Sequence, residues 1–264
     1  MNEFQEMIKG ICDNKNISIE LLSKDWIMKL TKGDKVKYIL GCRFPFNNQN
    51  TMMSCNDKYA TYEIMKNAGI PIIEHKLMYD KRKVTEYESD FLSDKEIKEY
   101  LKLNKKLVVK DTLGSGGKDV YLASTMSQVK RALKKVFKLN YTAVISPFID
   151  IDSEYRVICL DGNVEVIFEK VRTTSSWKHN LSQGAEARLV EDEKVKQIIS
   201  KMALKAMNVI DARFASVDIV RRKDEYMIIE INSGVYMNKF MEQVPNGKNI
   251  GRRVYEKAID KIFE

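Results

Sequence analysis

Apolar and polar positions alternate in two segments near the end of the sequence, residues 214–220 and 226–233. An alternation with a period of two is typical of half-buried strands, and the charged run between the segments predicts a turn. Glu230 and Asn232 are two positions apart, so their side chains point to one face of a strand. If a three-residue loop joins the strands, Asp218 lies opposite Glu230 on that face.

Asp218, Glu230 and Asn232 are therefore candidate metal ligands. Two carboxylates and one amide oxygen are hard ligands suited to Mg²⁺, which keeps its remaining coordination positions for water and substrate phosphates. The alternative is a surface hairpin with charged residues on its solvent-exposed face. The pairing alone does not decide between the two.

The hydrophobic pattern of the remaining chain predicts helices and hairpins in irregular order. Asp57 is placed to cap a helix that ends near Gly69, and Ser93 and Glu96 form a capping box for a second helix. The Asp-Gly pair at 161–162 is typical of a two-residue hairpin turn. Further strands are expected at 107–111, 119–122 and 143–148, and further helices at 126–138 and 191–209. Without regular βαβ alternation, this pattern predicts α+β lobes around a cleft.

The composition is that of a globular protein, with 44% hydrophobic and 31% charged residues in a chain of 264. No segment approaches the roughly 18 uncharged apolar residues of a membrane span. The polar, acidic start of the chain is unlike a signal peptide, so we expect a cytoplasmic protein without membrane contact. The four cysteines are scattered, which favours reduced thiols over disulfides or zinc ligands.

A net charge of +8 makes a polyanionic partner worth considering. The basic residues are dispersed, however, and the densest groups, 102–106 and 130–138, are interleaved with apolar residues. This spacing favours solvated helix faces over a nucleic-acid groove. A moderate positive excess also suits an enzyme whose ligands are phosphates and carboxylates.

A glycine-rich loop follows the strand expected at 107–111. Lys110 stands at the end of this strand, and the loop contains Gly114, Ser115, Gly116 and Gly117. Such a loop lets backbone N–H groups approach a phosphate, and the serine adds a hydroxyl donor. The spacing matches neither the common phosphate loop nor the dinucleotide-binding fingerprint, and a flexible hairpin tip is the alternative.

Several motifs occur in an order that resembles the ATP-grasp superfamily of carboxylate ligases, over about residues 56–245. Within it, the ribosomal-protein glutamate ligase and glutathione synthetase type is the most similar. The motifs are the segments 55–63, 67–71, 109–117, 146–156, 169–172 and 177–185, followed by Asp218, Glu230 and Asn232. The resemblance implies an α+β ATP-grasp fold, in which two α+β lobes sandwich ATP. We expect a short N-terminal α/β lobe at 1–55, a central lobe at 56–148 and a C-terminal lobe with the metal site at 149–264.

The resemblance also assigns nucleotide-binding residues. Lys58 and Lys110 resemble the two nucleotide lysines, and residues 114–117 resemble the mobile loop over the phosphates. Backbone groups near Phe148 and Ile149 would read the adenine edge. The remaining assignments are Ser146 in the interlobe hinge and Glu154 on the ribose. Ser146 stands where many relatives carry glutamate, and Asp111 stands where proline is common, so adenine recognition and loop geometry are expected to differ.

Arg172 matches the catalytic arginine of the family, and Asn180 is expected to assist it by orienting the carboxylate or the γ-phosphate. The alternative for Arg156 and Arg172 is structural pairing with Glu169, Glu165 or Asp152. His179 is interpreted as incidental or substrate-facing, and His75 as structural.

The resemblance implies an enzyme that uses ATP and Mg²⁺, with Mn²⁺ as an alternative ion. It would convert a carboxylate into an acylphosphate and join it to an amine. The alternatives are a nucleotide-binding regulatory or nucleic-acid-associated protein, and phosphoryl transfer to a different acceptor. The sequence does not identify the amino acid or peptide substrates. Because the N-terminal lobe is short, a second subunit or a carrier peptide is the candidate to complete the acceptor site.

Overall fold

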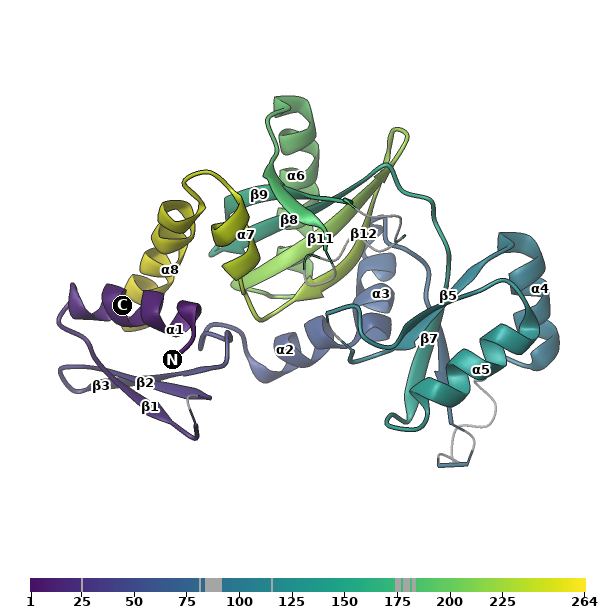
Figure 1. The fold of residues 1–264 in the computed structure, drawn as a ribbon, viewed down its shortest axis with the longest axis horizontal. Helices are drawn as coiled ribbons and strands as arrows, with labels where there is room; N and C mark the ends of the chain where they lie inside the picture. The colour runs from purple at the N-terminus through teal and green to yellow at the C-terminus, as the bar shows by residue number, and fades with distance from the viewer. Residues whose placement is uncertain are drawn as a thin grey trace.

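Three antiparallel sheets follow one another along the chain (Figure 1). The structure is a computed structural model of residues 1–264. It describes every residue except 25, 81, 84–91, 115, 174–176, 178–180 and 182–183. The α+β class expected from the sequence is confirmed. The three sheets lie within residues 18–40, 76–147 and 153–232, while the division into lobes at 55 and 148 stays a prediction.

The N-terminal sheet has the order β1-β2-β3 and packs against helices from both ends of the chain. Its elements are α1 (Glu3–Asp13), β1 (Ser18–Leu22), β2 (Ile27–Lys32) and β3 (Lys35–Leu40). The last helix, α8 (Gly247–Phe263), lies beside α1, so the two termini meet in this unit (Figure 1). Ile8, Met28 and Ile259 are fully buried between these elements. The C-terminal residues therefore stabilise the N-terminal unit.

The central sheet has the order β4-β7-β5-β6. Its strands are β4 (Lys76–Tyr79), β5 (Leu107–Asp111), β6 (Val120–Ala123) and β7 (Thr142–Pro147). Helices α4 (Asp94–Asn104) and α5 (Met126–Val136) pack on one face, where Ile97, Val109 and Val129 are buried. The other face carries Val108 and Lys110. Two further helices, α2 (Gln49–Asn56) and α3 (Lys58–Asn67), precede this sheet.

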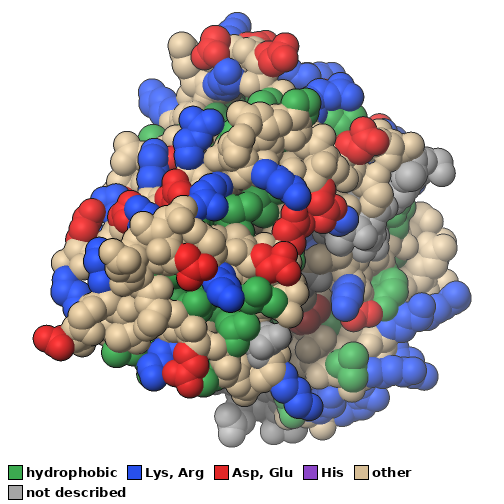
Figure 2. Space-filling view, turned by 60° about the vertical axis from the view of Figure 1, so that its left-hand side comes forward, with side chains coloured by type: hydrophobic (Ala, Val, Ile, Leu, Met, Phe, Trp, Pro, Cys, Tyr) green, Lys and Arg blue, Asp and Glu red, His purple; other side chains and the backbone are tan. Residues whose placement is uncertain are grey.

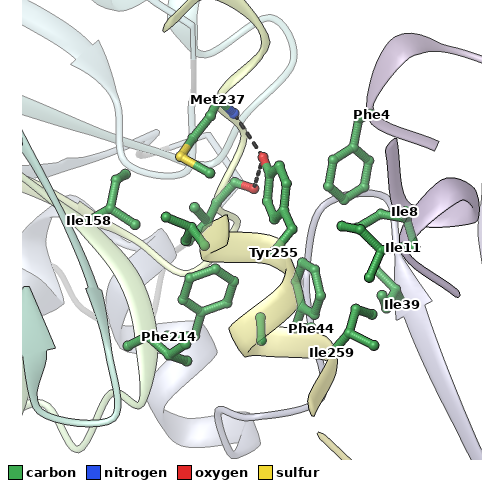
Figure 3. Close-up of a cluster of buried hydrophobic side chains, with 14 of the residues drawn as sticks. Phe4, Ile8, Ile11, Ile39, Phe44, Ile158, Phe214, Met237, Tyr255 and Ile259 are labelled. Atoms are coloured by element: carbon green, nitrogen blue, oxygen red, sulfur yellow. Dashed lines mark hydrogen bonds between the residues drawn. The ribbon is translucent and has the colours of Figure 1, made fainter. Parts of the chain in front are cut away.

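The C-terminal sheet has the order β10-β9-β8-β11-β12. Its strands are β8 (Ser153–Leu160), β9 (Asn163–Val171), β10 (Glu186–Leu189), β11 (Phe214–Arg222) and β12 (Glu225–Asn232). Helix α6 (Glu193–Val209) covers one face, where Val157, Ile199 and Val217 are fully buried. On the opposite face, Ile158, Phe168 and Phe214 belong to the core of the N-terminal unit, together with α7 (Asn238–Gln243) and α8 (Figure 3).

The hairpin of β11 and β12 pairs Asp218 with Glu230, as the sequence predicted, but by a different route. The turn has two residues rather than three, because Arg222 pairs directly with Glu225. A β-bulge follows, since Ile219 pairs with Ile228 whereas Asp218 pairs with Glu230. The bulge adds the one residue that the shorter turn omits, so the predicted register is restored.

Other local expectations are confirmed. Ser93 and Glu96 form the capping box of α4. Asp161 and Gly162 have φ angles of 45° and 74°, the left-handed backbone that a two-residue hairpin turn requires. Acidic and basic side chains are interspersed over the face seen in Figure 2. Among the described residues, no helix is both long and apolar enough to span a bilayer.

Candidate functional site

A cleft of about 1030 Å³, counted with its open mouth, lies between the central and C-terminal sheets. Most of the sequence-predicted site residues line it: Lys58, Lys110, Gly114, Gly116, Gly117, Ser146, Phe148, Ile149, Glu154, Asp218 and Glu230. Residues separated by up to 172 positions in sequence therefore share one cavity. Its size suits a ligand of nucleotide dimensions.

Lys58 joins the glycine-rich loop to the start of α3. It is the first residue of the helix, which Asp57 caps by accepting hydrogen bonds from two backbone N–H groups. The Lys58 backbone N–H donates to the carbonyl oxygen of Thr112 at 3.0 Å, and its amine donates to the carbonyl oxygen of Gly114. The lysine is 8% exposed. This positive charge is thus held at the base of the loop predicted to cover the phosphates.

Lys110 extends from β5 into the same cleft and is 9% exposed. Burial, reinforced by the positive charge of Lys58, lowers the pKa of its amine to about 8, while Glu230 and Glu154 act in the opposite direction. Because burial disfavours the charged form, an anion placed beside this amine would restore its usual pKa. The geometry suits binding of a phosphate.

The loop itself is shaped by Asp111, which stands where the family often has proline. Its carboxylate accepts a hydrogen bond from the backbone N–H of Leu113 at 3.2 Å, a turn in which the aspartate side chain replaces a backbone acceptor. Gly116 and Gly117 both have positive φ angles near 67°. Glycine adopts this backbone without strain, which explains its occurrence at both positions. The predicted phosphate contact at Ser115 lies outside the described residues.

The predicted hinge forms the opposite wall of the cleft. Ser146 is buried beside Val108 on the neighbouring strand, and the backbone N–H of Phe148 donates to the carbonyl oxygen of Lys106 at 3.0 Å. The ring of Trp177 meets that of Phe148 edge-on, with 5.6 Å between their centroids. A serine in place of the common glutamate leaves a wall that is mainly apolar here.

Four charged residues form a network on the floor of the cleft, on the face of the C-terminal sheet opposite α6. Arg156 binds Asp218 through two hydrogen bonds of 2.8 and 2.7 Å. Lys170 binds Asp218 at 2.8 Å and Glu154 at 2.6 Å. Burial alone would raise the pKa of the Asp218 carboxyl, but the charges of Arg156 and Lys170 lower it well below its usual range. Asp218 is therefore ionised.

This network corrects one sequence-based alternative, the pairing of Arg156 with Glu169, Glu165 or Asp152. Glu169 lies opposite Tyr155, so the strand alternation turns it away from Arg156. Glu165 instead binds Lys257, and Asp152 accepts a hydrogen bond from a backbone N–H. Arg156 instead pairs with Asp218, across the sheet.

The metal-binding prediction can be compared with the oxygen atoms that remain available. A carboxylate has about four lone-pair positions, and the network uses one on Oδ1 and two on Oδ2 of Asp218. One position on Oδ1 therefore remains. Glu230 lies opposite Asp218, and its Oε1 is 3.2 Å from the amide nitrogen of Asn232. The described residues contain no cluster of three His, Cys, Asp or Glu, so a metal here would need the asparagine, water or a phosphate.

Some predicted site residues are not brought into the cleft. Arg172 is exposed just beyond β9 and is absent from the cleft lining. Asn232 is also absent from the lining, although it is next to Glu230. Asn180 and His179 lie outside the described residues. Asn47 bonds the backbone of Arg213 and Phe214.

The structure adds residues that sequence reasoning did not assign to the site. Lys170 is the centre of the ion network, Trp177 forms part of the wall, and Lys118 lies at the end of the loop. Lys170 lies in β9, and Arg172 follows it by two positions, just beyond the end of the strand. The alternation rule that grouped Glu230 with Asn232 would also have grouped these two, and the buried member is the lysine.

His75, interpreted from the sequence as structural, is buried near the cleft lysines. It is 1% exposed, and its Nδ1 bonds the carbonyl oxygen of Ile73 at 2.7 Å. Burial and the charge of Lys110 lower its pKa well below the usual range, so the ring is neutral.

The chain is similar to known proteins over most of its length. A family model described as a RimK-like ATP-grasp domain matches residues 55–256. The uncharacterized protein MG011 of Mycoplasma genitalium is 26% identical over 203 residues, which cover 73% of this chain and 63% of that protein. The alpha-aminoadipate–LysW ligase LysX of Saccharolobus solfataricus is 25% identical over 222 residues, 82% of this chain and 74% of LysX.

The fold also resembles a solved structure, the D-alanine–D-alanine ligase of Bacillus anthracis in complex with ATP. The TM-score is 0.63 at 20% identity, over 82% of this chain and 67% of that ligase. At this identity the likeness shows the fold alone. This chain spans less than two thirds of the length of MG011, so the shared part is the domain rather than the whole protein. Since the family model covers the cleft and both sheets that form it, the chain belongs to the RimK-like ATP-grasp family.

Proposed function

We propose that this protein is a ligase that uses ATP and Mg²⁺ to activate a carboxylate as an acylphosphate and to join it to an amine. The observation that carries the proposal is the convergence of opposite charges in one cleft. Lys58 and Lys110 come from one wall, and Asp218 and Glu230 come from the other. Cations for phosphates opposite carboxylates for a metal are the two halves of a phosphoryl-transfer site.

The chain's own residues would bind and orient the nucleotide. The two lysines would neutralise its phosphates, and the backbone N–H groups of Gly116 and Gly117 would approach them closely. The base would lie in the mainly apolar wall formed by Phe148, Ile149 and Trp177, with Glu154 near the sugar. The ordered ion pair between Glu154 and Lys170 would fix that carboxylate.

ATP-grasp proteins use ATP with Mg²⁺, and the donor set fits this ion. Glu230, Asn232 and the remaining position on Oδ1 of Asp218 would hold it. Bound there, Mg²⁺ would neutralise charge on the transferring phosphate. The ion pairs to Arg156 and Lys170 would keep Asp218 oriented and ionised.

Arg172 remains the proposed catalytic arginine, with Asn180 as its proposed assistant. Support comes from its position, two residues beyond Lys170 at the end of β9. Because its side chain is exposed, this role requires the guanidinium to turn toward the cleft when substrates bind. Its planar fork of donors suits a phosphoryl group better than an ammonium does.

The substrates are proposed as a class: an amino acid or peptide carboxylate and an amine acceptor. The test is a screen for ADP release over amino acids, dipeptides and carrier peptides, with mass spectrometry of the products. We expect a product whose mass equals the sum of the two substrates less one water, as the formation of one amide bond requires. Glu230→Gln should lower turnover by roughly 100- to 1000-fold while the melting temperature is unchanged.

Three results would overturn all or part of the proposal. Full Mg²⁺-dependent turnover by Glu230→Gln would remove the metal assignment. Tight nucleotide binding without any product across the screen would instead favour a nucleotide-binding regulatory protein. Transfer of phosphate to a stable, non-carboxylate acceptor would identify a kinase-type reaction.

A further inference from the structure

The chain beyond β12 bends at 233–234, but its residues still alternate between buried and accessible. Ile231, Ser233, Val235 and Met237 are buried, whereas the residues between them remain accessible. The accessible positions are Asn232, Gly234 and Tyr236. Glu230 and Asn232 lie on one face of β12, and the accessible positions Gly234 and Tyr236 follow them directly in the chain. We call Asn232, Gly234 and Tyr236 the accessible strip.

Arg43 of the N-terminal unit packs on the middle of this strip. A Cβ atom at Gly234 would lie 3.5 Å from Cγ and 4.0 Å from Nε of Arg43, and only 2.9 Å from Sγ of Cys42. A side chain at this position would displace the thiol. Glycine therefore permits the arginine and the strip to come into direct contact.

The backbone around Arg43 is fixed on both sides. Arg43 and Leu40 exchange two backbone hydrogen bonds of 3.0 and 3.1 Å, which close a tight turn. The carbonyl oxygen of Cys42 accepts a hydrogen bond from Val235 at 3.2 Å, which ties the turn to the strip. On the other side, the buried ring of Phe44 stacks on Tyr255.

Tyr255 holds the end of the same strip. Its hydroxyl accepts a hydrogen bond from the backbone N–H of Met237 at 3.0 Å and donates to the carbonyl oxygen of Val235 at 3.4 Å (Figure 3). One buried side chain therefore fixes both the strip and the ring that follows Arg43. The position of Arg43 relative to the strip is set by the core.

The guanidinium of Arg43 has no hydrogen bond or ion pair with any part of the chain that the structure describes, although it is partly buried. Two arginines of the C-terminal sheet and its approach are paired, Arg156 with Asp218 and Arg213 with Asp161, each through two hydrogen bonds. A partly desolvated guanidinium fits a carboxylate through two parallel N–H donors. Arg43 can therefore bind a carboxylate, and the described part of the chain does not supply one.

The spacing along the strip matches a small substrate. Two extended residues span at most about 7 Å, and four span at most about 14 Å. Gly234 is two residues from Asn232 and four from Glu230. Arg43 is not among the residues that line the cleft, but it thus lies within one small-molecule length of the proposed metal ligands.

We infer that Arg43 and the accessible strip form a subsite for a second substrate carboxylate, distinct from the carboxylate that is activated. This inference rests on the proposed ligase function and narrows its substrates. At least one of them carries a free carboxylate that does not react, as an α-amino acid acceptor or a dicarboxylic donor does. The subsite selects such molecules over their neutral amides.

Binding measurements test the subsite without requiring turnover. The wild-type protein, loaded with ADP and Mg²⁺, is titrated with the common L-amino acids and with their α-carboxamides. We expect at least one free acid to bind more tightly than its amide. Arg43→Gln should weaken that binding by roughly 10- to 100-fold, and Arg43→Lys should weaken it less. ADP affinity should not change.

Arg222→Gln is the matched control, because Arg222 is exposed at the tip of the β11–β12 hairpin. Melting temperatures of all three variants verify that they fold. Should Arg43→Gln fail to fold, the Arg43→Lys variant and the acid-to-amide comparison in the wild type decide. The inference is wrong if no free acid binds, if acids and amides bind equally, or if the Arg43 variants bind like the wild type.

ADP release on the same panel separates this inference from the proposed function. Loss of acid binding in Arg43→Gln, together with no ADP release by the wild type, would leave the subsite standing and remove the ligase. Unchanged turnover in Arg43→Gln would leave the ligase standing and remove the subsite. Product masses identify which substrate carries the second carboxylate. If the donor must be glutamate rather than glutamine, the donor is dicarboxylic. If the amine substrate must be a free acid rather than an amide, the acceptor is an amino acid.

Discussion

One face of the C-terminal sheet is divided into an apolar half and a charged half. On β8, Arg156 belongs to the ion network of the cleft, and Ile158, two residues on, is fully buried in the core. On β11, Phe214 is buried in the same core, whereas Asp218 lies at the cleft. The same strands and the same side-chain alternation thus carry both environments.

The two halves contribute differently to the protein. Burial of apolar surface stabilises the fold by about 25 cal/mol per Å². Burial of paired charges costs desolvation energy that the ion pairs return only in part, so an apolar replacement of similar volume is often as stable. A buried ion network at a cleft is therefore explained by binding or catalysis, and the adjoining apolar half provides the stability that supports it.

The largest effect is expected from Asp218→Ala. This change leaves Arg156 and Lys170 without their shared carboxylate and should lower the free energy of unfolding by about 3–5 kcal/mol. It should also abolish turnover. The pKa of Asp218 is lowered in the folded protein, so its stabilising contribution is present above the unfolded pKa of about 3.9 and is lost as the pH falls below it.

Denaturant unfolding of wild type and Asp218→Ala at pH 7 and pH 3 measures both effects. We expect the difference in the free energy of unfolding between the two proteins to be smaller at pH 3 than at pH 7. If this difference is the same at both pH values, the ion network is not its cause.

Phe214→Ala should have a slightly smaller effect on stability and almost none on the site. Truncation of a buried phenylalanine costs about 3–4 kcal/mol through lost contacts and the cavity left behind. Because this residue lies in the apolar half, nucleotide affinity should be retained at temperatures where the variant is folded. Calorimetry with ADP and Mg²⁺ checks this, and a large loss of affinity would show that the halves are coupled.

Lys110 gives a pH-dependent prediction for the charged half. With its pKa lowered to about 8, the amine loses its proton in the free protein just above neutral pH. Nucleotide phosphates should raise this pKa, so binding takes up a proton, and affinity should fall by roughly fivefold between pH 8 and pH 9. Lys110→Arg stays charged and should show a flatter profile.

Titration calorimetry in two buffers of different ionisation enthalpy measures the proton uptake directly. The stability of the free protein should change with pH in the opposite direction to its nucleotide affinity. Below pH 8 the buried amine is charged in the folded protein, which lowers the free energy of unfolding. The free energy of unfolding should rise between pH 8 and the unfolded pKa of about 10.4. Equal heats in both buffers would contradict the assignment.

The smallest effect is expected from Tyr255→Phe in the apolar half. The change removes the hydroxyl that binds Met237 and Val235, leaving a buried backbone N–H without its acceptor. The free energy of unfolding should fall by about 1–2 kcal/mol, measured by denaturant unfolding. A loss near that of Phe214→Ala would indicate that ring packing has changed as well.

Local features were predictable from the sequence because short-range physics determines them. The capping box at Ser93, the turn at Asp161 and Gly162, and the strand at 107–111 all depend on neighbouring residues. Their dihedral preferences and hydrogen bonds are available without knowledge of the fold. The family motifs likewise named most of the residues that line the cleft.

The partners across the C-terminal sheet were not predictable in the same way. Asp218 meets Arg156 because β8 and β11 are adjacent, although the 53 residues from 161 to 213 separate the two strands. Contact between Arg43 and Gly234 depends on how the N-terminal unit packs, which no local pattern encodes. The bulge, by contrast, had a signal: adjacent Ile228 and Ile229 interrupt the alternation of β12.

Because of the bulge, a change in hairpin length has a different effect when it adds an odd number of residues than when it adds an even number. Ile229 shifts the alternation of the chain by one step, so the orientation of Glu230 and the accessible strip is inherited from that single residue. An insertion or deletion of one residue between the turn and the bulge would exchange inward and outward positions at Glu230 and Asn232. Changes of two residues would not. Homologous hairpins that keep the site are therefore expected to differ in length by even numbers, or to lose the bulge when the turn gains a residue.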